Sequence, residues 1–158
     1  MLRDPFARRR SLLALLPPSL QQDRPCTRFV YTALPARVVF GQGTIGQVAD
    51  EVRRLGCHRA LVLSTPPQRS DAERLAAHLG DLAVGVFSGA VMHTPVEVTE
   101  QAMSLVRDLG ADCVVAIGGG STTGLGKAIA LRTDLPQVVI PTTYAGSEAT
   151  RRQATSAW

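Results

Sequence analysis

The stretch of sequence that decides the fold is Val114-Val115-Ala116-Ile117-Gly118-Gly119-Gly120-Ser121-Thr122-Thr123-Gly124-Leu125-Gly126-Lys127. An apolar run ends in three glycines and a hydroxyl residue, and an apolar helical pattern follows, which predicts a buried strand that turns into a helix. Glycine lets a ligand approach the backbone, and a helix N-terminus favours an anion. We therefore expect the loop to bind a phosphate or pyrophosphate. The alternative is a glycine-rich turn that serves only the packing of strand against helix.

Neither of two common phosphate motifs fits this loop. A Walker A motif would need a glycine where Ser121 stands and a Ser or Thr where Ala128 stands, and Thr123 occupies the third glycine position of G-x-G-x-x-G. That second motif does occur at 41–46, between an expected strand and an expected helix. The tip of the following strand, Leu63-Ser64-Thr65, has no carboxylate to support it. We expect the 41–46 segment to be the weaker pyrophosphate candidate, or a tight turn into a helix.

Apolar runs and helical patterns alternate along the chain. Strands are expected over 29–33, 37–40, 60–64, 84–87, 113–117 and 137–140. Helices are expected from the pairs Thr44 with Gln47, Ser70 with Glu73, and Thr94-Pro95 with Glu97, ending at Gly56, Gly80 and Gly110, with a last helix over 125–131. This alternation predicts an α/β fold with a doubly wound, mostly parallel Rossmann-like sheet. Ligands of such sheets bind at the carboxyl ends of strands, where the glycine loop and Pro141-Thr142-Thr143 fall.

The composition is that of a globular chain of 158 residues, with 45% hydrophobic and 19% charged residues. The net charge of +4 comes largely from the two ends, and no basic stripe with aromatic residues argues for nucleic-acid binding. No apolar run reaches the roughly 18 residues of a membrane span. The cysteines, Cys26, Cys57 and Cys113, form no C-x-x-C pair, so neither a disulfide framework nor a zinc knuckle is indicated. We expect a cytoplasmic protein.

The histidines are scattered, and no His and carboxylate cluster predicts a metal site. His58 and His78 are expected at or near the surface. His93 precedes a helix start on the expected ligand side, where it either contacts substrate or cofactor or belongs to a plain loop. Residues 1–27 resemble a signal peptide only superficially, because Pro17-Pro18 ends the apolar run too early. We expect them to be a disordered extension, or the product of a start codon placed too far upstream.

Several separated motifs within 28–150 resemble the amino-terminal half of the iron-containing alcohol dehydrogenase superfamily. They are Gly118-Gly119-Gly120-Ser121 with Lys127, Ile140-Pro141-Thr142-Thr143 and Gly146-Ser147-Glu148. Within that superfamily, the segments 29–32, 90–97 and 140–148 resemble the maleylacetate reductases. Many members have an Asp where this chain has Gly124.

The resemblance implies an NAD(P)H-dependent oxidoreductase of two domains, a dehydroquinate synthase-like α/β domain that binds the dinucleotide and a helical second domain. Carried over by position, Gly119, Gly120 and Ser121 would hold the pyrophosphate, and Thr142, Thr143 and Ser147 would line the nicotinamide side of the cleft. Thr65 would meet the adenosine ribose. Because Thr65 is not acidic, both NADH and NADPH remain open.

The reaction implied is the reduction of the carbon–carbon double bond of maleylacetate to give 3-oxoadipate, in the catabolism of aromatic compounds. His93 and Tyr144 are the candidates for contact with this dicarboxylate substrate. Two alternatives stay open: an alcohol or polyol dehydrogenase of the same superfamily, and a non-catalytic nucleotide-binding module. The strand segment 29–40 implies a homodimer formed by strand exchange.

The resemblance fades after Thr150, and the helical domain with its Asp and His metal positions has no counterpart in the sequence. Residues 151–158 do not match the family pattern. We therefore expect a truncated chain, from a frameshifted gene or a fragmentary gene model. Metal-free operation is what the resemblance to maleylacetate reductases implies.

Overall fold

The computed structural model describes residues 29–33, 36–143 and 146. Its centre is a parallel sheet of four strands, β3 (Ala60–Leu63), β4 (Ala83–Phe87), β5 (Cys113–Gly118) and β6 (Gln137–Pro141). The strand order is β4-β3-β5-β6, and each neighbouring pair is parallel. This arrangement confirms the α/β fold and the parallel sheet expected from the sequence.

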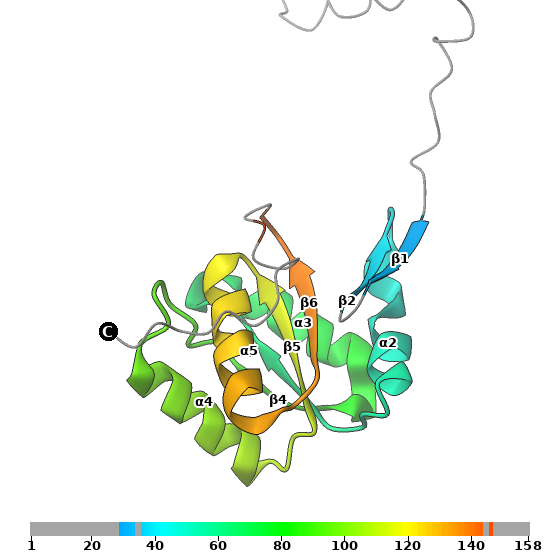
Figure 1. The fold of residues 1–158 in the computed structure, drawn as a ribbon. Helices are drawn as coiled ribbons and strands as arrows, with labels where there is room; N and C mark the ends of the chain where they lie inside the picture. Colours follow the sequence, from blue (N-terminus) through cyan, green and yellow to red (C-terminus); the bar gives the residue numbers. More distant parts are fainter. Residues whose placement is uncertain (1–28, 34–35, 144–145, 147–158) are drawn as a thin grey trace, which may run out of the picture.

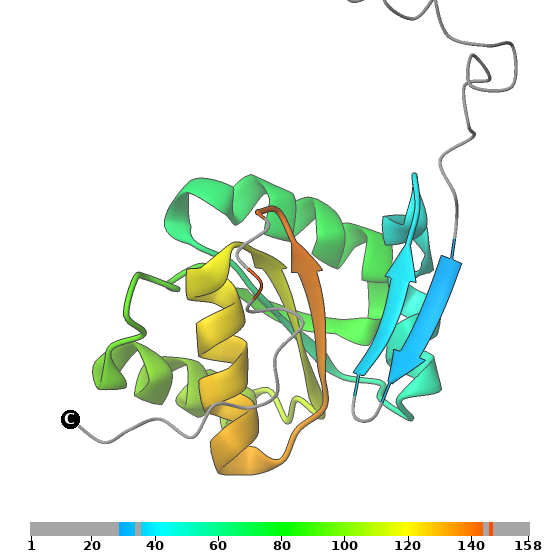
Figure 2. The same ribbon diagram turned by 45° about the horizontal axis from the view of Figure 1, so that its top comes forward.

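The apolar runs of β3 and β5 are continuous because the sheet is covered on both faces. Figures 1 and 2 show α3 (Arg69–Leu79) on one face of the sheet, and α4 (Val96–Asp108) and α5 (Gly120–Thr133) on the other. Alternate strand residues enter two separate cores. One core contains Ala60, Val62, Cys113, Val115 and Ile117, together with residues of α2 (Val48–Arg54) and α3. The other contains Leu61, Leu63, Val114 and Ala116, together with residues of α4 and α5. The sheet is therefore doubly wound.

The helices begin elsewhere than the capping patterns predicted. A 3-10 turn, η2 (Thr44–Gln47), precedes α2, and the Thr44 hydroxyl donates to the carbonyl of Gly41 at 2.9 Å instead of capping the helix. A second turn, η3 (Pro66–Gln68), leads into α3, so that Ser70 lies inside that helix. Pro95 is the N-cap of α4 and not its first residue. The predicted capping boxes are therefore wrong, because short 3-10 turns precede the first residues of α2 and α3.

After α3 a further turn, η4 (Gly80–Leu82), leads directly into β4. Among the described residues, no helix is both long enough and apolar enough to cross a lipid bilayer.

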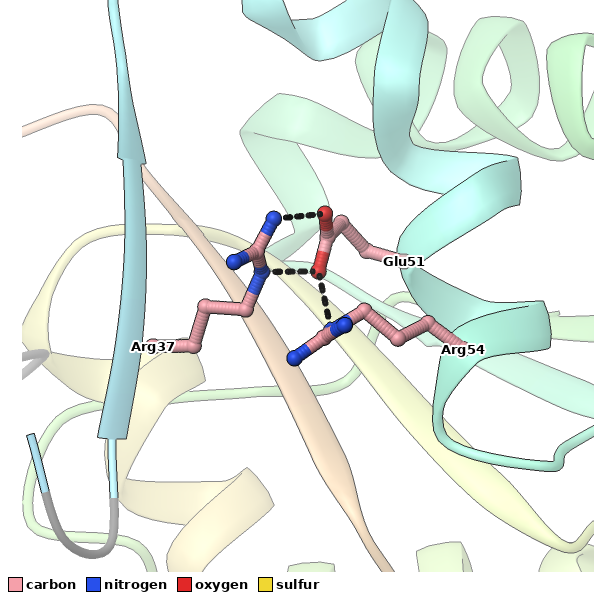
Figure 3. A network of polar contacts seen from close by, with 3 residues as sticks. All are labelled: Arg37, Glu51 and Arg54. Atoms are coloured by element: carbon pink, nitrogen blue, oxygen red, sulfur yellow. Dashed lines mark hydrogen bonds and ion pairs between the residues drawn. The ribbon is translucent and has the colours of Figure 1, made fainter. Parts of the chain in front are cut away.

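A separate antiparallel hairpin of β1 (Phe29–Ala33) and β2 (Ala36–Phe40) stands beside α2 in both overall views. An ion pair ties β2 to that helix (Figure 3). The Arg37 guanidinium donates to both carboxylate oxygens of Glu51, with Nε–Oε2 at 2.9 Å and Nη2–Oε1 at 3.2 Å, and Arg54 Nε lies 3.9 Å from Oε2. Two-point pairing of this kind holds a planar guanidinium in one orientation. The pair therefore fixes how the hairpin sits on α2.

We expect Glu51→Gln to lower the free energy of unfolding by about 1 kcal/mol at low ionic strength, and by less in high salt. The Glu51 and Arg37 side chains are only 22% and 30% exposed, which places the effect at the upper end of surface ion pairs. Urea unfolding at two salt concentrations measures it. Asp50→Asn is the matched control, because the Asp50–Arg53 pair is mostly exposed and its loss should change little. Equal effects of the two substitutions would contradict the role given to the Arg37–Glu51 pair.

Candidate functional site

The chain changes direction in the sheet between β3 and β5. Helix α3 leads from β3 to β4 on one side, and α4 then returns the chain to β5 on the other side of β3. At such a switch point the connections leave the carboxyl ends of the two strands in opposite directions and open a crevice between them. The residues that follow these two strand ends are Ser64 to Gln68 and Gly119 to Ser121. The glycine loop therefore lies where a ligand of this fold binds.

The three glycines of this loop differ in what they allow. Gly118 has φ +149°, and a Cβ there would lie 2.5 Å from the Thr122 hydroxyl oxygen and 2.8 Å from Gln68 Oε1. A Cβ on Gly119 would lie 2.9 Å from the Thr143 hydroxyl oxygen. A Cβ on Gly120 would meet nothing within 4 Å. Internal packing thus accounts for the first two glycines and gives no reason for the third, whose open side is free to receive a ligand.

Helix α5 begins directly at the loop, with Gly119 as a cap that offers no side-chain hydrogen bond. Its first turn closes with the bond from the Thr123 N–H to the Gly119 carbonyl at 3.1 Å. The N–H groups before Thr123 have no partner within the helix, since they precede its first turn. This helix is 14 residues long, and its dipole adds partial positive charge at the same end. The loop and helix together make a site suited to an anion such as pyrophosphate.

A chain of hydrogen bonds crosses the carboxyl edge of the sheet from β3 to β6. The Thr65 hydroxyl donates to Gln68 Oε1 at 3.0 Å, and Gln68 Nε2 donates to the Thr142 hydroxyl oxygen at 3.0 Å. The Thr142 N–H in turn donates to the Gly118 carbonyl at 3.0 Å. The structure thereby links Thr65 and Thr142, which the sequence analysis singled out separately, through Gln68. The sequence analysis did not identify Gln68. The signal that could have found it is its position shortly after β3, one of the two strands at the switch point.

The loop between β4 and α4 comes close to α5 at Gly124. His93 in this loop is exposed, and both His93 and Thr94 have positive φ values, +65° and +44°. Such backbone strain in residues other than glycine is found preferentially at functional sites. A Cβ on Gly124 of α5 would lie 2.9 Å from the Thr94 hydroxyl oxygen. Gly124, where many superfamily members have Asp, is therefore the position at which this loop comes close to α5.

The remaining predicted residues fall into two groups. Ser121 is half-buried in the first turn of α5, and Thr142 and Thr143 are exposed at the end of β6. These three share the carboxyl edge with Gly119, Gly120 and Thr65. Tyr144 and Ser147 lie outside the described residues.

The second glycine motif, at 41–46, follows β2 of the antiparallel hairpin and not a strand of the parallel sheet. Its backbone closes tight turns, with Thr44 N–H donating to the Gly41 carbonyl at 3.4 Å and Gly46 N–H to the Gly43 carbonyl at 3.1 Å. This supports its interpretation as a turn into a helix.

Comparison with known proteins agrees with this geometry. The model of the iron-containing alcohol dehydrogenase family matches residues 35–155. Maleylacetate reductase from Rhizobium sp. (strain MTP-10005) is 72% identical over 122 residues, which is 77% of this chain and 35% of the relative. The crystal structure of maleylacetate reductase from Agrobacterium tumefaciens superposes with a TM-score of 0.72 at 69% identity, covering 77% of this chain and 35% of that one. Sulfoacetaldehyde reductase from Bifidobacterium kashiwanohense, solved in complex with NAD+, has a TM-score of 0.64 at 25% identity, covering 70% and 35% of the two chains. This chain therefore spans about a third of the length of the relatives it matches.

Proposed function

The chain belongs to the iron-containing alcohol dehydrogenase family, and on that premise we propose that residues 28–150 are the dinucleotide-binding domain of an NAD(P)H-dependent oxidoreductase of the maleylacetate reductase type. The observation that carries this proposal is the open side of Gly120 at the uncapped N-terminus of α5. A glycine that packing does not require, placed on main-chain N–H groups, is suited to close approach by a pyrophosphate. The high identity to maleylacetate reductases supports the choice within the family.

In this proposal Gly119, Gly120 and Ser121 hold the pyrophosphate through main-chain N–H groups. Thr65, at the tip of β3, lies beside the adenosine ribose, while Thr142, Thr143 and Ser147 line the nicotinamide side. The Gln68 bridge holds the Thr65 and Thr142 hydroxyls at a fixed separation, so that the two ends of the dinucleotide meet a preformed edge.

The reaction we propose is reduction of the carbon–carbon double bond of maleylacetate, for which bound reduced nicotinamide supplies the hydride. The protein must hold the substrate alkene near the nicotinamide and stabilise the negative charge that develops on the adjacent carbonyl oxygen. His93, exposed at the carboxyl edge, and Tyr144 are the residues of this chain that we propose for contact with the substrate carboxylates.

The family name implies iron, and the described residues do not fit an iron ion beside the dinucleotide. The one group of three metal-ligating side chains among them is Cys57, Asp112 and Cys113. Cys57 lies in the connection before β3, and Asp112 and Cys113 lie at the start of β5, at the amino-terminal edge of the sheet. That edge is opposite the glycine loop, so no step of the proposed reaction passes through this group.

We also propose a homodimer in which the β1–β2 hairpin pairs with that of a second copy. A two-stranded sheet leaves main-chain N–H and carbonyl groups unpaired along its outer edges. Sedimentation equilibrium of the chain measures the association, and a monomer at all concentrations would contradict it.

Thr65→Asp is expected to shift dinucleotide preference from NADPH toward NADH by about tenfold, or roughly 1.4 kcal/mol. A carboxylate at the tip of β3 accepts a hydrogen bond from the 2′-hydroxyl of NADH and repels the 2′-phosphate of NADPH. Parallel titrations of the variant with the two dinucleotides measure the ratio of dissociation constants, and Thr65→Ser is the matched control. A ratio that is the same in the Asp and Ser variants would place the ribose elsewhere.

NMR of the isotope-labelled chain tests the location of the site. Adding NADH should shift the amide signals of Gly119, Gly120 and Ser121, and subsequent maleylacetate should shift that of His93. Shifts confined to the 41–46 turn, or no shifts at all, would contradict the proposed function.

A further inference from the structure

A cluster of two thiols and a carboxylate lies at the edge of the sheet opposite the glycine loop. It consists of Cys57, just before β3, and Asp112 and Cys113 at the start of β5, where Cys113 is in register with Ala60. Both cysteines are buried. One ligand atom from each of the three residues lies within 4.8 Å of the others. We propose that these three side chains bind a thiophilic divalent cation of the zinc class.

Main-chain contacts hold the carboxylate in place without a metal. Asp112 Oδ2 accepts the N–H of His58 at 2.8 Å, and Oδ1 accepts the N–H of Arg59 at 2.9 Å. The Asp112 N–H also donates to the Arg59 carbonyl at 2.9 Å. Burial raises the pKa of Asp112, but the two N–H donors outweigh burial and the net pKa lies below its ordinary value. The two N–H donors fix the carboxylate, and each oxygen keeps a lone pair for a metal.

The two sulfur atoms are also held in position. The Cys57 N–H donates to the Val52 carbonyl at 3.2 Å, and its thiol lies 3.6 Å from the Leu55 carbonyl and 3.7 Å from the Asp112 carbonyl. In a tetrahedral zinc site with zinc–sulfur bonds of about 2.3 Å, two sulfur atoms stand roughly 3.8 Å apart. Ligand atoms that already lie within 4.8 Å of one another need to close by only a small distance.

The three side chains form a mixed sulfur and oxygen ligand set. Two cysteines and a carboxylate are ligands that zinc accepts, and in a tetrahedral site a water molecule takes the fourth position. Cys57 comes from the connection before β3, and Asp112 and Cys113 come from the start of β5, so the cation would join two chain segments that Asp112 already links through hydrogen bonds.

Metal binding replaces one proton on each thiol. Burial, with the negative charge of Asp112, raises the pKa of Cys57, and burial with the nearby Cys57 and Asp112 raises the pKa of Cys113. As the cation binds, each thiol releases its proton to solvent and forms a metal–thiolate bond, so two protons leave for the two bonds formed. Simple packing of two inert cysteines would account for their burial, but it does not require a carboxylate oxygen within 4.8 Å of both sulfur atoms.

Cobalt(II) added to the full, reduced chain tests the site, because thiolate ligands give cobalt a charge-transfer band and a tetrahedral site gives it intense visible bands. We expect one cobalt per chain, displaced by zinc. Cys57→Ser should reduce the charge-transfer band by about half and weaken binding at least tenfold. Cys26→Ser, at the third cysteine of the chain, is the matched control and should change neither.

Because replacement at the buried cysteines can disturb folding, Asp112→Asn at the half-buried carboxylate provides a second variant. It should keep the charge-transfer band and weaken cobalt binding severalfold, with an unchanged circular dichroism spectrum. Absence of a charge-transfer band in the reduced chain would overturn the proposal, as would an equal band in Cys57→Ser or its loss in Cys26→Ser. A chain that forms a Cys57–Cys113 disulfide in air but binds no cobalt when reduced would also overturn it.

Discussion

Replacing Gly118 with alanine should lower the free energy of unfolding by about 3 kcal/mol, from backbone strain and overpacking together. The backbone at Gly118 has φ +149°, which side chains rarely tolerate, and the new methyl group would lie 2.5 Å from the Thr122 hydroxyl oxygen. Thr122 is fully buried, so its side chain has little room to turn away. Urea unfolding followed by circular dichroism measures the change.

Gly120→Ala is the control for this prediction, since it makes the same chemical change two residues later. A Cβ at Gly120 meets no neighbour, and the residue has no positive φ. Alanine also favours a helix more than glycine does, so we expect stability to be unchanged or slightly higher. Equal destabilisation by the two substitutions would contradict the assignment of Gly118 as sterically restricted and of Gly120 as open.

Replacing Gly120 with valine should leave the fold intact and weaken NADH binding at least tenfold, which corresponds to about 1.4 kcal/mol or more. The valine side chain would fill the open space above the first N–H groups of α5, where the pyrophosphate must come within roughly 3 Å of them. Fluorescence titration with NADH measures the affinity, and circular dichroism confirms the fold.

Gly46→Val is the matched control for the binding experiment. A Cβ there also meets no neighbour, but Gly46 belongs to the turn at 41–46 and lies outside the proposed site. It should bind NADH as the unchanged chain does. If Gly46→Val weakened binding and Gly120→Val did not, the pyrophosphate would belong to the 41–46 turn.

The parallel sheet could be predicted from the sequence because its signal is local. The segments that form β3 and β5 are continuous apolar runs without alternating polar residues. This composition indicates strands that are buried on both faces of the sheet. The predicted first residues of the helices were wrong because a capping pattern does not show which kind of turn precedes the helix. Thr44 and Ser70 satisfied capping patterns, but the 3-10 turns at 44–47 and 66–68 lead into the two helices, and neither helix has a side-chain cap.

The candidate site was only partly predictable. The glycine loop is continuous in sequence, so its residues could be named from the motif. The bridge through Gln68 joins Thr65 and Thr142, residues that are distant in sequence, and depends on the strand order, which no local pattern contains. The Cys57 and Cys113 pair was likewise hidden, because only the parallel register of β3 and β5 brings these residues together.

The central claim, that the glycine loop binds a nicotinamide dinucleotide, is tested most directly by titrating the purified chain with NADH and following nicotinamide fluorescence. The account predicts saturable binding of one NADH per chain, competed by NAD+ and lost in Gly120→Val. A folded chain that shows no saturable change in fluorescence, or that binds NADH equally well with valine at position 120, would contradict it.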